Sequence, residues 1–190
     1  MKKTTCSLIC SVAGLWFATA TDGQADGYFL QIDLASETSD VVVATTRGTF
    51  SYGANYSSYE GGWSLGASVT RDFAIENFGT VKIGPSIGTT DERDDFAVGA
   101  KLVLERYVPT NFGFVFLLGQ YNTIDDDFFT LAQIGNGKGI SVDLSAGKSD
   151  TYSEQSIAVN YLLGDSPVSL RGGYRFKARE IFLGVSLNTF

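Results

Sequence analysis

The side chains that could do chemistry in this 190-residue chain are its carboxylates and bases, because histidine is absent. Without an imidazole there can be no Ser–His or Cys–His catalytic pair and no histidine-containing metal site. The chain has 21 Asp and Glu residues against 14 Lys and Arg residues, which gives a formal net charge of −7. This acidic balance argues against nucleic acid as a partner, because nucleic-acid binding requires a basic face.

Two short acidic runs are the remaining candidates for catalysis or ion binding. They are Asp94-Asp95 and Asp125-Asp126-Asp127, which could act as an acid and base pair or as calcium ligands. Solvated loop residues explain such runs more simply, and we prefer that interpretation. The sequence therefore predicts that the protein is not an enzyme and has neither a metal site nor a cofactor.

The first 20 residues have the composition of a cleaved secretory signal peptide. Lys2 and Lys3 precede a mostly apolar stretch from Cys6 to Phe17, and Ala18-Thr19-Ala20 supplies a small-x-small cleavage pattern. The apolar stretch is shorter than the ~18–20 residues that span a bilayer. Both cysteines, Cys6 and Cys10, lie inside this segment, so we expect no disulfide in the exported chain.

The rest of the chain repeats one pattern, in which apolar and polar residues alternate between polar or glycine-rich turns. The alternation is clearest from Val168 to Lys177, whereas Val41-Val42-Val43 and Phe112 to Leu118 are apolar on both faces. The predicted turns separate twelve strands, with ten as the alternative strand number. These turns are expected at residues 36–40, 46–48, 57–62, 76–79, 89–95, 109–113, 122–127, 135–139, 147–153, 164–167 and 177–180.

A soluble β-sandwich and a membrane β-barrel both produce this alternation. An even number of strands, short turns at one end and longer acidic loops at the other favour the barrel. Strands of about 9–11 residues are also long enough to span a membrane. Isolated strands cannot satisfy their backbone groups in lipid, so the sheet must close. We therefore predict an all-β fold, in which residues 21–190 form a closed antiparallel up-and-down transmembrane barrel. Aromatic residues near the predicted strand ends suit a girdle at the membrane interface; they are Tyr28, Tyr56, Trp63, Tyr107 and Tyr161.

The signal peptide, the single run of amphipathic strands and the terminal segment Ile181–Phe190 resemble a small bacterial outer-membrane β-barrel of the porin-like superfamily. The resemblance implies a location in the bacterial outer membrane, contact with lipid and lipopolysaccharide, and insertion by the barrel-assembly machinery. In that family the final aromatic residue, here Phe190, is part of the assembly signal. Phe190 is one step out of phase with the apolar face of the last strand, which predicts a bulge near Asn188. Pro85 is a second departure, because proline cannot donate to a strand ladder.

The polar faces of the predicted strands carry charged residues that we expect to line the pore. These are Asp33, Lys82, Lys101, Glu105, Asp143, Glu154, Arg171, Arg175 and Lys177, with Asp72 and Asp95 also on the polar faces. Arg171, Arg175 and Lys177 form a basic stripe on one strand, which resembles small twelve-stranded porins for acidic sugars. Such charges select solutes in a water-filled lumen, or they pair and plug a narrow one.

The function favoured by the sequence is that of a small porin-like channel for passive diffusion of small solutes. A closed structural barrel of the envelope is the alternative, and a soluble periplasmic β-sandwich that binds a ligand is a lower one.

Overall fold

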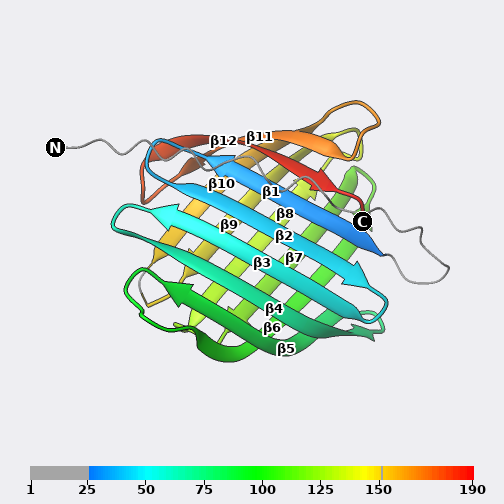
Figure 1. Cartoon of the computed structure of the whole chain (residues 1–190). Coiled ribbons are helices and arrows are strands. Elements are labelled where there is room, and N and C mark those ends of the chain that lie inside the picture. Colours follow the sequence, from blue (N-terminus) through cyan, green and yellow to red (C-terminus); the bar gives the residue numbers. More distant parts are fainter. Residues whose placement is uncertain (1–25, 151) are drawn as a thin grey trace.

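The computed structural model describes residues 26–150 and 152–190, and the predicted signal peptide, residues 1–20, lies outside these ranges. The described residues contain no helix long and apolar enough to cross a membrane. They form twelve strands, and Figure 1 shows their arrangement. The strands are β1 (Gly27–Leu34), β2 (Ser39–Arg47), β3 (Phe50–Tyr59), β4 (Gly62–Ile75), β5 (Gly79–Thr90), β6 (Ala97–Thr110), β7 (Gly113–Asn122), β8 (Asp127–Gly135), β9 (Ile140–Lys148), β10 (Ser153–Leu162), β11 (Val168–Arg175) and β12 (Glu180–Asn188).

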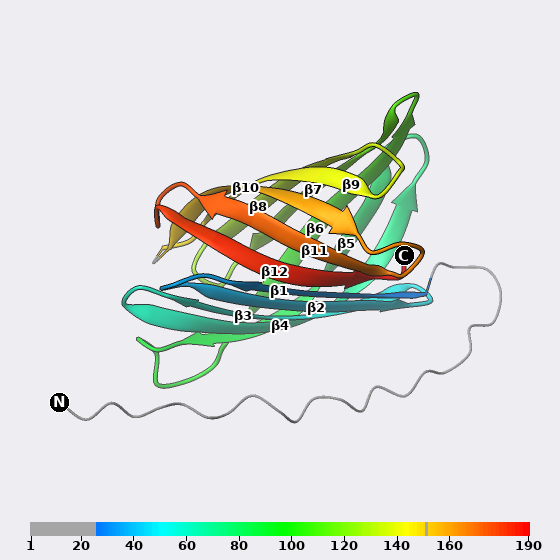
Figure 2. The ribbon, with the colours of Figure 1, turned by 90° about the horizontal axis from the view of Figure 1, so that it is seen from above.

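Every strand pairs antiparallel with its neighbours in sequence, and β1 also pairs with β12, so the sheet is a closed barrel. Each predicted turn overlaps the segment that joins two of these strands, although several extend into the strands, as residues 57–62 do where β3 ends at Tyr59 and β4 begins at Gly62. The predicted fold and the strand number of twelve are therefore confirmed, and the alternative of ten is wrong. In Figures 1 and 2, strands β1–β4 form one wall and strands β7–β10 the opposite wall, while β11 and β12 join them on one side.

The distribution of polar and apolar residues is the reverse of that in a soluble protein. The buried residues are mainly polar or charged, and the buried apolar ones among those described are Val103, Ala158 and Phe182. Large apolar side chains instead cover the outer surface, as in β12, where Ile181 is 72% exposed and Leu183 is 69% exposed. A polar interior and an apolar exterior are the arrangement of a barrel that lies in lipid. The alternative of a soluble β-sandwich is therefore wrong.

The proline within β5 is accommodated by a gap in one ladder. The pairing of β5 with β4 is interrupted between Ser68↔Ser86 and Arg71↔Ile83, whereas Pro85 keeps its place opposite Ala100 of β6. Within the gap, a Cβ atom on Gly84 would lie 2.0 Å from the carbonyl oxygen of Val69. The glycine therefore allows β4 and β5 to approach where the proline cannot donate a hydrogen bond.

The C-terminal residue lies outside the last strand, and the predicted bulge is absent. Pairing of β1 with β12 runs without a break from Leu34↔Leu183 to Phe29↔Asn188. The strand then ends, and the ring of Phe190 occupies the space that a side chain on Gly27 would need. Because β12 ends at Asn188, Phe190 does not continue the alternation of the strand, and its phase needs no bulge. The prediction of a bulge near Asn188 is therefore wrong, and Phe190 follows the last strand instead of ending it.

Candidate functional site: the barrel interior

Ion pairs between strands that are not neighbours show which side chains face the interior. Arg171 of β11 donates from Nε to Asp33 Oδ1 on β1 and from Nη1 to Asp143 Oδ2 on β9, each over 2.9 Å. Each acceptor strand lies two positions away from β11 in the barrel. One side chain can reach both only across the concave face of the sheet. These three residues therefore define the inward phase, and strand register extends that phase around the barrel.

The cluster around Arg171 is buried and its hydrogen bonds are well satisfied. Nη1 also donates to Asn160 Oδ1 over 2.9 Å. Gln133 donates to Asp143, and Gln31 donates to Asp33, each over 2.8 Å. The Arg171 side chain is only 9% exposed. Charges buried to this degree are stable only when they are paired and hydrogen-bonded, as these are.

The second arginine of the predicted basic stripe also pairs across the β12–β1 seam. Arg175 donates from Nη2 to Asp40 Oδ2 on β2 over 2.6 Å, and its Nη1 lies 3.8 Å from Glu180 Oε1 on β12. Between the two arginines lies the buried ring of Phe182, whose centroid is 5.0 Å from the Arg175 guanidinium and 5.9 Å from that of Arg171. Carboxylates therefore compensate the positive charges of Arg171 and Arg175, and the Phe182 ring adds a cation–π contact to each.

The third member of that stripe, Lys177, lies beyond the end of β11, in the β11–β12 turn. Its Nζ donates to Ser153 Oγ over 2.5 Å. Glu154 accepts hydrogen bonds from the backbone amides of Lys177 and Ala178 over 2.8 and 2.9 Å. The structure therefore places Glu154 and Lys177 at the end of the barrel opposite the termini, where they hold a turn.

A carboxylate of β12 fixes the first turn of the chain in the same way. Glu180 accepts hydrogen bonds from Ser36 Oγ and the Glu37 amide, each over 3.1 Å, and from Thr38 Oγ1. Since residues 36–38 connect β1 with β2, this contact also crosses the seam between β12 and β1. Sequence reasoning missed Glu180, because only the closure of the barrel brings it beside residues 36–38.

The remaining predicted pore residues lie on strands β5 and β6, on the side of the barrel away from the β12–β1 seam. Lys82 of β5 lies 3.0 Å from Glu105 of β6 and 3.6 Å from Asp72 of β4, and it donates to Ser51 Oγ over 3.2 Å. The side chain of Lys101, also on β6, forms no salt bridge or hydrogen bond with another described residue. The predicted charges therefore form two separate networks, one on the continuous run of strands from β9 to β2 and the other on the run from β3 to β6, while Lys101 belongs to neither.

Side chains from opposite walls meet at the end of the barrel that carries the longer loops. The rings of Tyr59, at the end of β3, and Tyr152, in the β9–β10 turn, lie 5.0 Å apart. Burial and the nearby carboxylate of Asp40 raise the pKa of the Tyr152 hydroxyl, which keeps it neutral. This contact narrows the loop-side mouth. The alternation of residues contained no signal for it.

The acidic runs lie in loops except for Asp127, which begins β8 and faces inward, and the Asp125–Asp126 pair is held by residues of adjacent loops and strands. Arg93 donates to Asp125 over 2.5 Å, and the amide of Asp150 donates to the carbonyl oxygen of Asp125 over 2.9 Å. Asp126 accepts a hydrogen bond from the hydroxyl of Tyr121 over 2.6 Å. Within residues 26–150 and 152–190, no group of three acidic residues is arranged to hold a metal ion.

Three inward glycines are each covered by a phenylalanine of the neighbouring strand. The pairs are Phe114 with Gly135, Phe129 with Gly147 and Phe182 with Gly173. A Cβ atom on Gly135 would lie 2.1 Å from the Phe114 ring, and one on Gly173 would lie 2.5 Å from the Phe182 ring. The rings therefore cover the barrel wall where the glycines leave room, an arrangement known from cross-strand pairs in designed sheets.

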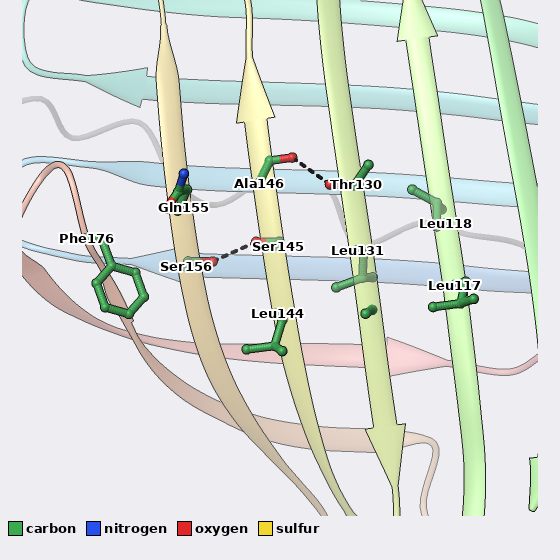
Figure 3. Close-up of a pocket in the computed structure, with 11 residues that line it drawn as sticks. Leu117, Leu118, Thr130, Leu131, Leu144, Ser145, Ala146, Gln155, Ser156 and Phe176 are labelled. Atoms are coloured by element: carbon green, nitrogen blue, oxygen red, sulfur yellow. Dashed lines mark hydrogen bonds between the residues drawn. The ribbon is translucent and has the colours of Figure 1, made fainter.

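A groove of about 530 Å³ lies along strands β7–β10, and Figure 3 shows its lining. Small residues on these strands, Thr130, Ala132 and Ala146, lie between the larger side chains of Leu117 and Leu144. All five share the outward phase, and the two leucines are 43% and 48% exposed. The groove is therefore mainly a feature of the apolar outer wall.

Removing the Arg171 guanidinium is expected to destabilise the barrel strongly. In Arg171→Leu, Asp33 and Asp143 lose their shared counter-charge while they remain buried, and such a loss typically costs about 3–5 kcal/mol. Urea unfolding in lipid vesicles, followed by the fluorescence of Trp63, measures the change. Arg106→Leu removes an exposed arginine and is the control. Equal stability of the two variants would contradict a structural role for the cluster.

Filling the space beneath a lumen ring is also expected to destabilise the barrel. In Gly135→Ala the new methyl group must displace the Phe114 ring, and overpacking of this kind costs about 1–3 kcal/mol. Gly119→Ala is the matched control, because a Cβ atom at that position has no neighbour within 4 Å. The same urea titration compares the two. Similar midpoints would show that the ring is free to move away.

No protein-family model matches the sequence. No curated protein matches it either. Two solved structures resemble the computed one, and both cover 85% of this chain and 98% of their own. The first, "KdgM porin in complex with disordered oligogalacturonate", is 8% identical with a TM-score of 0.54, and the second, "KdgM porin", is 9% identical with a TM-score of 0.54. The chain therefore shares the closed-barrel fold of the KdgM porin.

Proposed function

We propose that the protein is a bacterial outer-membrane channel for the passive diffusion of small solutes. The observation that carries the proposal is a closed barrel with an apolar exterior and an incompletely filled polar interior. Asn55 faces inward through its pairing with Val42 and Gly66, and yet it is exposed. Water therefore reaches this part of the inner wall. The role needs no catalytic group and no cofactor.

The arrangement of charges also supports an open lumen. Each ion-pair network occupies one continuous run of strands, from β9 to β2 or from β3 to β6, and no salt bridge among the described residues joins the two runs, so the pairs line the walls. Eight-stranded barrels are filled by side chains, whereas sixteen strands leave an aqueous channel. Twelve strands with many inward glycine and serine residues fall between these cases. In this proposal the nine predicted pore residues belong to the wall of the lumen, and two of them, Glu154 and Lys177, lie at its loop-side mouth.

The balance of inward charges favours cations over anions. Acidic residues outnumber basic ones in the inward phase, and both arginines of the basic stripe are paired with carboxylates. We therefore do not extend the oligogalacturonate ligand of the KdgM complex to this chain, because that ligand is a polyanion. The inward acids are Asp33, Asp40, Asp72, Glu105, Asp127, Asp143, Glu154 and Glu180, and the inward bases are Lys82, Lys101, Arg171 and Arg175.

Location and partners are part of the same proposal. A cleaved signal over residues 1–20 would export the chain, and the apolar outer wall would contact lipid and lipopolysaccharide. Phe190 is 56% exposed beyond the end of β12, which leaves part of its ring available to a barrel-assembly machinery. Deletion of Phe190 tests this role through the yield of inserted barrel in cells, compared with refolding of the same variant in detergent.

Single-channel recording in a planar bilayer tests the proposed function. We expect discrete conductance steps from the folded chain, after a shift in gel migration on heating has shown that the barrel is intact. A heat-modifiable barrel that never conducts would overturn the channel proposal. It would favour a structural role in the envelope, for which the contact between Tyr59 and Tyr152 across the mouth is the supporting observation.

A positive charge placed on the accessible inner wall is expected to reduce the preference for cations. Asn55→Lys adds this charge at an exposed inward position, and charges in a confined lumen act on passing ions at short range. The reversal potential in a KCl gradient measures the shift, which should weaken at high salt. Asn55→Gln has a side chain of similar polarity without the charge. A lysine variant with the reversal potential of the glutamine variant would exclude Asn55 from the ion path.

A further inference from the structure

One part of the inner wall carries large apolar side chains among its polar ones, although polar side chains usually line a membrane barrel. On strands β6, β7 and β8 six valine, leucine and phenylalanine residues occupy inward positions, and we call these six the apolar strip. Leu118 lies opposite Leu131 on one side and opposite Glu105 on the other. A polar interior is the rule for transmembrane barrels, so this strip is a departure from it. The apolar strip consists of Val103, Phe114, Phe116, Leu118, Phe129 and Leu131.

The apolar strip is not the core of a packed plug. Of its six residues, only Val103 is buried, and the other five keep part of their surface exposed. Across the lumen, the inward positions of β3 before Tyr59 at the mouth are small or polar; they are Ser51, Gly53, Asn55 and Ser57. A molecule in the lumen would therefore meet an apolar surface on one side and hydrogen-bonding groups on the other.

Packing against neighbouring side chains does not explain why a leucine occupies the inward position 118. Leu117 points into the apolar surroundings of the outer wall, whereas the neighbouring Leu118 points into a polar lumen. Leaving apolar surface in contact with water forgoes about 25 cal/mol for each Å² that a partner would bury. A solute with an apolar face would recover that free energy when it lies against the strip. The rings of Phe114 and Phe129 add flat surfaces, because each lies against the wall over a glycine.

We propose that the apolar strip binds small organic cations that carry an apolar ring. The ring would stack on the strip, and the overall excess of inward acids over inward bases would attract the positive charge; Asp127 lies on β8 with part of the strip, whereas Glu105 is already paired with Lys82. The inference rests on the proposed channel function, because it describes what the lumen recognises during passage. The proposal gives the apolar strip a role in binding a solute, whereas the charged side chains of the two wall networks bind one another.

Equilibrium binding to the folded chain in detergent tests the strip independently of conductance. The probes are benzyltrimethylammonium, which has a ring, and tetramethylammonium, which has the same charge without one. Saturation-transfer NMR, with empty micelles subtracted, should detect the first and not the second. We expect Leu118→Ala to weaken the binding of benzyltrimethylammonium about fivefold, since roughly 1 kcal/mol of apolar contact is lost.

The neighbouring residue supplies the matched control. Leu117→Ala makes the same deletion on the outer wall, and it should leave the affinity unchanged. If Leu118→Ala fails to fold, Leu131→Ala on the strip and Ile134→Ala on the outer wall form a second pair. Equal binding of the two probes, or equal losses in the inward and outward variants, would overturn the proposal.

Conductance measured in parallel separates the two proposals. A conducting barrel that does not distinguish the probes would overturn the apolar strip and leave the channel intact. A silent barrel that binds benzyltrimethylammonium through Leu118 would overturn the channel function and leave the strip as a binding surface within a closed barrel.

Discussion

The closure of the sheet between β1 and β12 is the constraint on which the rest of the structure depends. An unpaired backbone group in lipid costs several kcal/mol, so a spanning sheet with a free edge is not stable there. Closure brings residues from the two ends of the described chain into register, from Leu34↔Leu183 to Phe29↔Asn188. Because side chains alternate along each strand, closure also separates an apolar exterior from a polar interior.

The seam that closes the barrel is also where its buried charges gather. Arg171 reaches Asp33 over a sequence separation of 138 residues, and Arg175 reaches Asp40 over 135. Glu180 holds the β1–β2 turn across the same seam. Backbone pairing at the seam is thus supplemented by side-chain pairs that form only when β1 and β12 meet. Charges in this interior need partners in any case, and here the partners lie on the two sides of the joint.

Most of the fold could be predicted because its determinants are local. Alternation with a period of two identifies strands, and polar or glycine-rich segments such as residues 91–96 identify turns. The contacts that define the interior are different in kind. Which acid meets Arg171, and why Tyr59 meets Tyr152, depends on the stagger and curvature of the closed sheet, which no local pattern contains. The segment from Phe112 to Leu118 was visibly apolar on both faces, but only the register showed that Phe114, Phe116 and Leu118 line the lumen.

The dependence of side-chain contacts on the closed sheet also explains why the arginines of the basic stripe have another role in the structure than the sequence suggests. In the sequence, Arg171 and Arg175 alternate along one strand and resemble a path for anions. In the barrel each is bound to carboxylates of other strands, so their charge contributes to stability and little of it remains for a passing solute. A likeness at 8–9% identity shows a shared barrel fold, and the chemistry of the wall has to be derived from this chain's own residues. What this lumen recognises must therefore follow from the inward groups that the networks leave available, which are the acidic excess, Lys101 and the apolar surface of β6–β8.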